Sequence, residues 1–202
     1  MVRHAESNAN ALNTHGGAES ELSDNGIKQA RSVAKRFAQT DADVILCSKY
    51  RRAVQTAKII NEVVGRKIIY NEVLGEWRYP SELRGKISGN DAEKKIWDAI
   101  DRNWSNPKWH YSDEENISEV KKRAEKALKF LKSRKEDSLI VIIHGAFMGV
   151  MLGLILFGNE MTGEQLRRSR RFFLMKNTAI TELEIRDDES VRLATFNDYT
   201  HL

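Results

Sequence analysis

The sequence predicts an α/β protein, a three-layer sandwich in which a mostly parallel central sheet is flanked by helices, with a small inserted cap. Short apolar strands alternate with amphipathic helices along most of the chain. Strands that are apolar on both faces are typical of parallel sheets covered by helices on both sides. The segment from about 77 to 115 breaks this alternation, since all four tryptophans and both prolines lie in it. We therefore expect residues 1–202 to form a single domain with a cap insertion at about 77–115.

The first half of the chain supplies two strand–helix units. An apolar stripe predicts a helix over Ile27–Gln39, and Ser23 is suited to cap its N-terminus. Asp43–Cys47 is predicted as a short buried strand, followed by a polar turn and a helix from about Arg52 to Val64. Lys67–Tyr70 is predicted as the next strand. Strand, helix and strand in this order favour parallel pairing.

The second half contains a long helix and a C-terminal hairpin. Periodic apolar residues predict a helix over Ile117–Arg134, and Asn116 with Glu119 resembles a capping box at its start. The segments Ala179–Arg186 and Val191–Phe196 flank an acidic turn and are predicted as the two strands of a hairpin.

An apolar run from Leu139 to Phe157 is long enough to raise the question of a membrane span. Its first part, Ile140–Ile143, is β-branched and favours a buried strand. His144 and the glycine after it interrupt the run, and Ala146–Leu156 is predicted as a buried helix. We therefore predict one further strand–helix unit and no membrane partner.

Composition narrows the class of protein. Apolar residues make up 41% of the chain, enough for a core, and charged residues of both signs make up 31%, which argues against disorder. The net charge of +4 favours anionic ligands without choosing between phosphate esters and nucleic acid. A single cysteine, Cys47, excludes an internal disulfide framework and favours a reducing compartment. With no secretory signal visible, we expect a cytoplasmic protein.

Three predicted strands run into polar residues of one chemical kind. Met1-Val2 leads into Arg3-His4, the strand ending at Cys47 leads into Ser48–Arg52, and the strand ending at Ile143 leads into His144. Ligands of open parallel sheets bind outside the carboxyl ends of the strands. If these strands are neighbours, two histidines and at least two arginines converge on one site.

Such a set of side chains suits a phosphate monoester. Arginine offers a planar fork of donors to phosphate oxygens, a neutral imidazole can attack phosphorus, and a second imidazole can stabilise the transition state. The leaving group also needs an acid, for which Glu72 and Glu76 are both candidates. Gly75 lets the chain bend toward the pocket, which favours Glu76. Single histidines are often structural, and Arg51 competes with Arg52, so spacing alone leaves these roles open.

Six segments, in order along nearly the whole chain, resemble the motifs of the histidine phosphatase (phosphoglycerate-mutase-like) superfamily. They are Arg3-His4-Ala5-Glu6-Ser7-Asn8-Ala9-Asn10, Leu22–Ala30, Ser48–Ala57, Leu74-Gly75-Glu76, His144-Gly145 and Asn177-Thr178-Ala179-Ile180. The resemblance implies the superfamily's α/β sandwich and a phosphohistidine mechanism.

The resemblance also implies a role for each matching position. His4 would be the nucleophile that becomes phosphohistidine, and Glu76 would be the acid that later activates water. The phosphate pocket would be formed by three side chains, Arg3, Arg52 and His144. Substrate contacts would come from three further residues, Asn10, Ser7 and Gly145.

Three departures from the superfamily pattern stand out. Ala5 replaces the usual glycine after the nucleophile, and Lys49-Tyr50 replaces Pro-Leu in the turn before Arg52. Only Met1 and Val2 precede Arg3, whereas the family has a longer first strand. The resemblance therefore implies a truncated first strand, with backbone groups of the neighbouring strands left unpaired.

We predict a phosphatase that hydrolyses a small-molecule phosphate ester, with a cofactor-dependent phosphoglycerate mutase as the alternative that shares the phosphoenzyme. The third alternative is a non-catalytic phosphate- or nucleic-acid-binding module, because Arg167–Arg171 is a dense basic run before a predicted strand at Phe172–Met175. We favour a solvated surface for that run over nucleic-acid binding. No histidine pair has metal-binding spacing, so no metal and no cofactor are expected.

The cap and the basic run are the segments expected to set the substrate. Aromatic residues usually serve packing, so most of the tryptophans are expected to form a small core within the cap. One or two of them lining the substrate pocket is the alternative. Neither the substrate nor the oligomeric state follows from the sequence.

Overall fold

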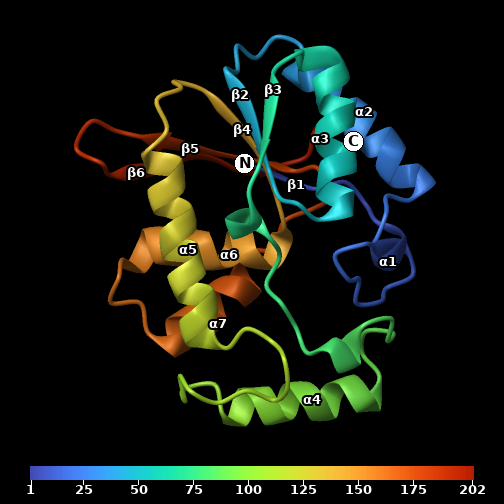
Figure 1. The fold of residues 1–202 in the computed structure, drawn as a ribbon, viewed down its shortest axis with the longest axis vertical. Helices are drawn as coiled ribbons and strands as arrows, with labels where there is room; N and C mark the ends of the chain where they lie inside the picture. The colour runs from blue at the N-terminus through green and yellow to red at the C-terminus, as the bar shows by residue number, and fades with distance from the viewer.

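The computed structural model describes all of residues 1–202 and contains a six-stranded sheet in the order β3-β2-β4-β1-β5-β6 (Figure 1). The strands are β1 (Val2–Arg3), β2 (Val44–Cys47), β3 (Lys67–Tyr70), β4 (Leu139–Ile143), β5 (Ile180–Ile185) and β6 (Val191–Asp198). The first four are parallel, while β5 and β6 are an antiparallel hairpin at one edge. The mostly parallel sheet and the C-terminal hairpin predicted from the sequence are confirmed.

Helices cover both faces of the sheet. They are α1 (Asn8–Ala11), α2 (Asp24–Phe37), α3 (Arg51–Val64), α4 (Asp91–Arg102), α5 (Ile117–Lys132), α6 (Gly145–Phe157) and α7 (Gly163–Phe172), with short 3₁₀ turns η1 (Glu72–Leu74) and η2 (Ser81–Leu83). Figure 1 shows α2 and α3 on one side of the sheet and α5, α6 and α7 on the other. The three-layer sandwich is therefore confirmed.

Alternate residues of the central strand β4 supply the two cores. Ile140 and Ile142 pack with α2 and α3, whereas Val141 and Ile143 pack with α5 and α6. Successive side chains of a strand point to opposite faces, so a strand buried on both sides must be apolar throughout. This is why β2 and β4 are continuous apolar runs in the sequence.

Side-chain caps fix where the helices begin. The Ser23 side chain accepts a hydrogen bond from the Gly26 N–H, so α2 begins three residues before the apolar stripe that predicted it. The predicted capping box of α5 is present, with Asn116 accepting from the Glu119 N–H and the Glu119 carboxylate accepting from the Asn116 N–H.

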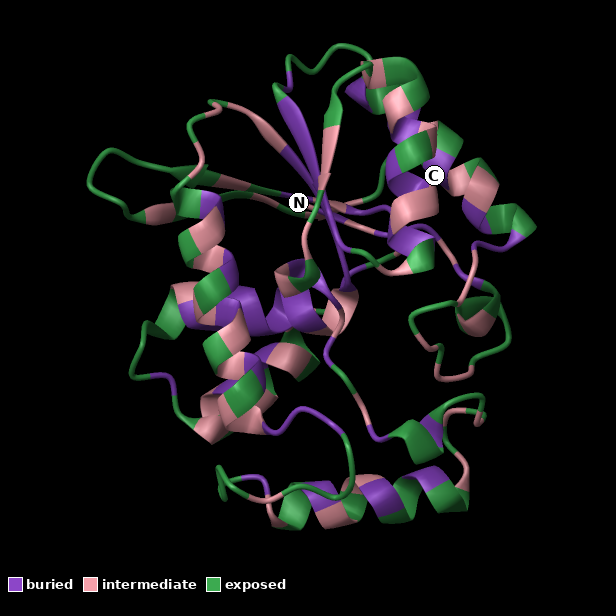
Figure 2. Ribbon diagram, viewed as in Figure 1, coloured by how far each residue is buried: buried purple, intermediate pink, exposed green.

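The apolar run of the second half divides as predicted. β4 ends at Ile143, and α6 begins after His144 and is buried along most of its length (Figure 2). A helix that is apolar all round belongs in the interior of a layered protein. No helix in the structure combines the length and the apolar character needed to cross a membrane.

The two-residue strand β1 is paired on both sides. Val2 lies opposite Ile142 of β4 and Ile180 of β5, and the His4 N–H donates to the Ile143 carbonyl at 2.9 Å. The first three residues of β4 pair with β2 alone. The short strand therefore leaves unmatched length on β4, while its own residues are held in place.

One predicted element is wrong. Phe172–Met175 is not a strand, because α7 extends to Phe172 and takes the basic run Arg167–Arg171 into a helix. Thr162 and Gln165 form a capping box at its start, and Glu164 pairs with arginines three and four residues later. These local contacts favour a helix over the extended chain that the apolar residues after the run suggested.

Residues 77–115 leave the sheet after η1 and return at the start of α5. Figure 1 shows α4 set apart from the sheet and beneath α7. Trp77 and Trp104 belong to the same buried core as α5 and α6, and their rings lie 5.6 Å apart. Trp104 Nε1 also donates to the Gly163 carbonyl of α7 at 2.8 Å. The segment therefore packs onto the main core, not around a separate core of its own.

Candidate active site

The carboxyl ends of β1, β2 and β4 meet, and they bring the predicted residues together. His4 follows β1, His144 follows β4, and their ring centroids lie 5.1 Å apart. Arg52, at the start of α3 after β2, donates from Nε to His4 Nε2 at 3.0 Å. All three side chains are buried. The convergence inferred from the order of strands and motifs is what the structure shows.

Two hydrogen bonds fix the proton of His4. Nδ1 lies 2.7 Å from the Ala5 carbonyl, which can only accept, so Nδ1 carries the proton. Nε2 faces the Arg52 N–H, which can only donate, so Nε2 presents its lone pair. Burial first, and then the charges of Arg52 and Arg3, hold the pKa of His4 well below its ordinary value. The imidazole is therefore neutral, and its unprotonated Nε2 is able to act as a nucleophile.

Two buried nitrogen atoms in this pocket have no hydrogen-bond partner, Arg3 Nε and His144 Nδ1. The Arg3 guanidinium is anchored by Nη1, which donates to the Met175 carbonyl at 2.5 Å. A buried polar group left unpaired costs about 1–3 kcal/mol, so such groups point to a ligand. The His144 ring lies 5.1 Å from the His4 ring, and Arg3 directly precedes His4 in the chain, so both atoms can serve an anion held at this strand end.

His144 is oriented by the turn after β2. Its Nε2 lies 2.8 Å from Ser48 Oγ, which itself accepts from the Tyr50 N–H at 3.2 Å. A Ser48 hydroxyl that donates to Nε2 leaves the proton of His144 on Nδ1, which can then donate to an anion. Burial, Arg52 and His4 hold the pKa of His144 well below its ordinary value. Tyr50, the departure from the superfamily motif, packs its ring 4.9 Å from that of His144.

Gly145 gives the Arg3 side chain its space. A Cβ at this position would lie 3.2 Å from Arg3 Nε and 3.5 Å from its guanidinium carbon. Gly145 also starts α6, whose first N–H groups face the same end of the sheet. Gly145 therefore borders the Arg3 side chain at the start of α6.

Glu76 and Glu72 lie in different surroundings. Glu76 accepts from the N–H groups of Trp77 and Phe147, both at 2.9 Å, and so sits at the N-terminus of α6 next to the pocket. Glu72 is an exposed carboxylate that pairs with Lys49 Nζ at 2.5 Å. Of the two candidate acids, Glu76 lies at the first turn of α6 and Glu72 lies at the surface.

Asn10 and Ser7 are joined to each other. Ser7 Oγ accepts from the Asn10 N–H and Asn10 Oδ1 accepts from the Ser7 N–H, each at 3.2 Å. Asn177 Nδ2 donates to the His4 carbonyl at 3.0 Å and to Asn10 Oδ1 at 3.3 Å. Ser7 is the buried N-cap residue of α1, whereas the Asn10 side chain is exposed.

The remaining motif residues hold the backbone that follows His4. Gln29 accepts from the Glu6 N–H at 2.9 Å, and Thr56 accepts from the Ala5 N–H at 3.0 Å. Gly26 is required for a close approach, because a Cβ there would lie 1.9 Å from the Glu6 carbonyl oxygen. These motif residues therefore fix the conformation of the loop after His4.

Arg123 is an important residue that the sequence did not reveal. Its guanidinium donates to the carbonyls of Val73, Gly75 and Glu76 and forms a two-bond ion pair with Glu115. The turn that carries Glu76 is thereby fixed to α5. In the sequence, Arg123 directly precedes Ala124, on the buried face of that helix, which is the one available signal of its partial burial.

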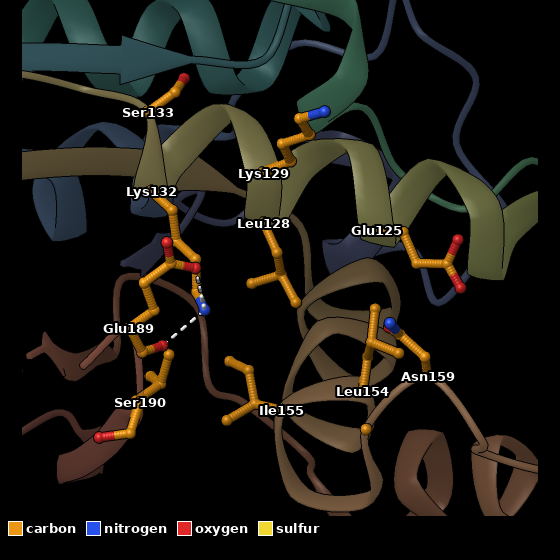
Figure 3. Close-up of a pocket in the computed structure, with 12 residues that line it drawn as sticks. Glu125, Leu128, Lys129, Lys132, Ser133, Leu154, Ile155, Asn159, Glu189 and Ser190 are labelled. Atoms are coloured by element: carbon orange, nitrogen blue, oxygen red, sulfur yellow. Dashed lines mark hydrogen bonds and ion pairs between the residues drawn. The ribbon is translucent and has the colours of Figure 1, made fainter.

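Two cavities differ in their relation to this pocket. A broad cavity of about 1040 Å³ lies between α5, the end of α6 and the β5–β6 turn, where Lys132 Nζ donates to the Glu189 carbonyl (Figure 3). None of the strand-end residues lines it. A smaller cavity of about 400 Å³ is lined by the loop after α1, including Gly17, whose carbonyl accepts from Arg52 at 2.8 Å. The smaller cavity therefore adjoins the pocket.

Comparisons with known proteins agree with this geometry. The sequence profile of the histidine phosphatase superfamily (branch 1) matches residues 1–199. A candidate phosphoserine phosphatase of Hydrogenobacter thermophilus is 30% identical over 206 residues, covering 100% of this chain and 95% of the relative. A protein of Photorhabdus laumondii named a probable phosphoglycerate mutase is 30% identical over 160 residues, covering 77% of this chain and 73% of the relative.

The fold is shared with a solved phosphoserine phosphatase of Entamoeba histolytica, determined as a mutant in complex with phosphoserine. The two structures agree with a TM-score of 0.76 at 24% identity, over 100% of this chain and 96% of the other. The profile match spans the sheet, the strand-end pocket and the hairpin alike. The chain therefore belongs to the histidine phosphatase superfamily (branch 1).

Proposed function

We propose that this phosphatase works in two steps through a phosphohistidine at His4. In the first step, His4 Nε2 forms a bond to phosphorus, the bond from phosphorus to the ester oxygen breaks, and that oxygen takes a proton from Glu76. In the second step, a water oxygen bonds to phosphorus, the bond to Nε2 breaks, and Glu76 takes the proton of the water. The enzyme returns to its starting state with one ester hydrolysed.

One observation carries the proposal. The unprotonated Nε2 of His4 lies among cationic and imidazole donors, two of which are buried with no protein partner, Arg3 Nε and His144 Nδ1. Dianionic phosphoryl oxygens would satisfy these donors, and the bond to Arg52 would orient the attacking nitrogen. Asn10 and Gly145 would contact the same group from the edge of the pocket.

Glu76 suits both proton transfers because its position is fixed. Backbone N–H groups of two neighbours hold its carboxyl group, and Arg123 holds its turn. A proton donor must reach within about 3 Å of the leaving oxygen, directly or through one water, so a fixed carboxyl group is favoured over a mobile one. The exposed Glu72 lacks this restraint.

The substrate is proposed to be a small phosphate monoester, enclosed between the pocket and residues 77–115 as a cap. The similarity to named phosphatases over the whole chain supports hydrolysis. The similarity to proteins named phosphoglycerate mutases supports a second candidate, in which the phosphoryl group returns to a sugar acid. Both share the phosphoenzyme and differ in whether water takes the group.

The intermediate can be tested by labelling. The enzyme is mixed with a ³²P-labelled ester, quenched within milliseconds and analysed for label that is stable to alkali and released by acid, as expected for phosphohistidine. The wild-type chain should carry this label, and His4→Ala should carry none and show no turnover. His110→Ala serves as the matched control, since His110 is exposed and pairs with Glu119 at 3.0 Å. Phosphate release from His4→Ala at the wild-type rate would contradict the mechanism.

The same assay separates the two candidates. With 3-phosphoglycerate as substrate, a phosphatase releases inorganic phosphate, whereas a mutase forms 2-phosphoglycerate and releases little. We expect release of phosphate. Rapid interconversion of the two isomers would favour the mutase.

A further inference from the structure

The arginine run of α7 divides into paired and unpaired members. Arg167 and Arg168 both pair with Glu164 at 2.8 Å, and Arg171 pairs with Asp101 of α4 at 3.0 Å. Arg170 has no acidic side chain within 4.0 Å, and it is half-buried where Arg168 is exposed. One arginine of the run is therefore turned inward without a counter-ion.

Aromatic rings of the cap surround the inward arginine. The Arg170 guanidinium carbon lies 5.0 Å from the ring centre of Trp97 and 5.4 Å from those of Trp77 and Tyr79. We call these three side chains the aromatic cage. Contacts of this kind hold a cation by attraction to the ring faces and leave its N–H groups free. The single side-chain hydrogen bond of Arg170 runs from Nη2 to Tyr79 Oη at 3.3 Å.

Close packing of α7 against α6 fixes the backbone position of Arg170. A Cβ at Gly149 of α6 would lie 3.3 Å from Arg170 Cα, so the two helices touch at this point. α6 is also the helix whose first N–H groups hold Glu76. Arg170 therefore belongs to α7, which packs directly against α6, and α6 binds Glu76 through its first N–H groups.

Tyr79 links the cage to the phosphate pocket. Its ring packs edge-on against that of His15 in the loop after α1, with centroids 6.0 Å apart. Burial raises the pKa of Tyr79, and the nearby charges of Arg170 and Arg3 oppose this rise. Glu76 acts on Tyr79 and on Arg170 as well. His15 also lines the smaller cavity that adjoins the phosphate pocket, so Tyr79 connects the cage to that side of the pocket.

We propose that Arg170 determines specificity by binding a carboxylate that the substrate carries beside its phosphate. A guanidinium has five N–H donors in a planar fork that matches a carboxylate, and Arg170 uses one of them on a protein side chain. The cage removes water from the cation, which strengthens its attraction to an anion. The favoured substrates are small phosphate monoesters of a carboxylic acid.

This inference rests on the proposed phosphatase function, and matched substrates separate the two. O-Phosphoserine and O-phosphoethanolamine have the same phosphate and the same amine and differ by the carboxylate alone. The wild-type enzyme should hydrolyse phosphoserine with a kcat/KM at least about tenfold above that of phosphoethanolamine, as one charge-assisted contact supplies. Hydrolysis of both at equal rates would overturn the carboxylate site while leaving the phosphatase in place. No hydrolysis of any phosphate monoester would overturn the proposed function itself.

Variants then test the residue. Arg170→Met keeps a long apolar side chain in the cage and removes the donors. It should lower kcat/KM for phosphoserine about 10- to 100-fold and change that for phosphoethanolamine less than about threefold. Arg170→Lys keeps the charge without the fork and should lie between wild type and Arg170→Met. Arg171→Met, next in the helix and paired outside the cage, is the matched control and should change neither substrate.

A purely structural role makes a different prediction. If Arg170 only fastens the cap to α7, Arg170→Met lowers kcat/KM for both substrates by the same factor and lowers the melting temperature with it. That outcome would overturn the inference. A loss confined to the carboxylated substrate, with an unchanged melting temperature, supports it.

Discussion

The phosphate pocket and the aromatic cage bind charged groups by different means. In the pocket, His4 and His144 follow adjacent strands, and backbone hydrogen bonds fix the position of each. In the cage, Arg170 is held by three ring faces from the cap, two on irregular chain and one, that of Trp97, on α4. Strand ends hold the side chains of the pocket in a fixed geometry, which suits the phosphoryl group that every substrate shares. A cage made of side chains can change with few substitutions, which suits the part of the site that chooses among substrates.

The largest expected effect in the pocket comes from replacing the proposed acid, Glu76. Glu76→Gln should slow hydrolysis of an alkyl phosphate by about 10²- to 10⁴-fold, because an alkoxide leaves poorly without a proton. An activated aryl phosphate should lose much less, since its phenolate leaves unaided. Steady-state kcat with both esters measures the difference. Glu72→Gln is the matched control, and a leaving-group dependence in that variant alone would show that the acid has been misassigned.

Arg123 connects the two regions, so its loss should affect both. It fixes the turn of Glu76 and pairs with Glu115 at the end of the cap, with side chains 18% and 6% exposed. Arg123→Met leaves a buried carboxylate unpaired and should lower the free energy of unfolding by about 3 kcal/mol. Urea denaturation measures this change, and kcat should fall for phosphoserine and phosphoethanolamine alike.

The control for this variant is Arg66→Met, which breaks an exposed pair with Asp41 and should leave the unfolding transition nearly unchanged. If Arg123→Met lost activity on one substrate only, the two regions would be less closely coupled than the hydrogen bonds indicate.

The buried histidines give the pocket a pH signature. The pKa values of His4 and His144 are held below the ordinary 6.5, so the folded state keeps both rings neutral while the unfolded chain takes up protons. The stability that follows is complete above pH 6.5 and is lost as the pH falls below it, by at most about 1.4 kcal/mol per pH unit for each ring. Denaturation between pH 7 and 5 measures the slope.

Activity should respond differently from stability. The neutral His4 persists below pH 6.5, so single-turnover phosphorylation by an aryl phosphate should show no inflection near that value. A free energy of unfolding that stays level down to pH 5 would mean that the two rings are not buried as neutral groups.

The smallest expected effect is that of chelation. The positive charge around His4 comes from Arg3 and Arg52, and no group of three or more metal-ligating side chains is present in residues 1–202. Dialysis against EDTA should leave kcat unchanged within error for both substrates. Loss of activity that a divalent ion restores would place a metal in one of the two regions.

The sequence predicted the pocket far better than the cage, for a physical reason. β4 and α6 were predictable because a strand buried on both faces must be apolar, and the polar His144 marked its end. The resemblance supplied Arg52 over Arg51, and the structure places Arg52 against His4. Local patterns of this kind are short and repeat with the period of the element.

The cage had no such pattern. No helix was predicted at α7, because the basic run was expected to be a solvated surface before a strand at Phe172–Met175. The helix depends on pairs with Glu164 and a cap at Thr162. Which arginine turns inward depends on the packing of α7 against α6 and on rings some 70 to 90 positions earlier in the chain. Contacts between distant segments leave no periodic trace in the sequence.

The central place of β1 has a consequence for how activity appears during folding. Val2 pairs with Ile142 and Ile180, so the strand that leads into His4 closes loops of well over 100 residues on both sides. Contacts of such long range form slowly, because the chain entropy must be lost before the contacts are gained. The helices and the β2–β3 unit can assemble earlier from nearer parts of the chain. Enzymatic activity should thus return in the slowest phase of refolding, after most of the helical signal has already recovered.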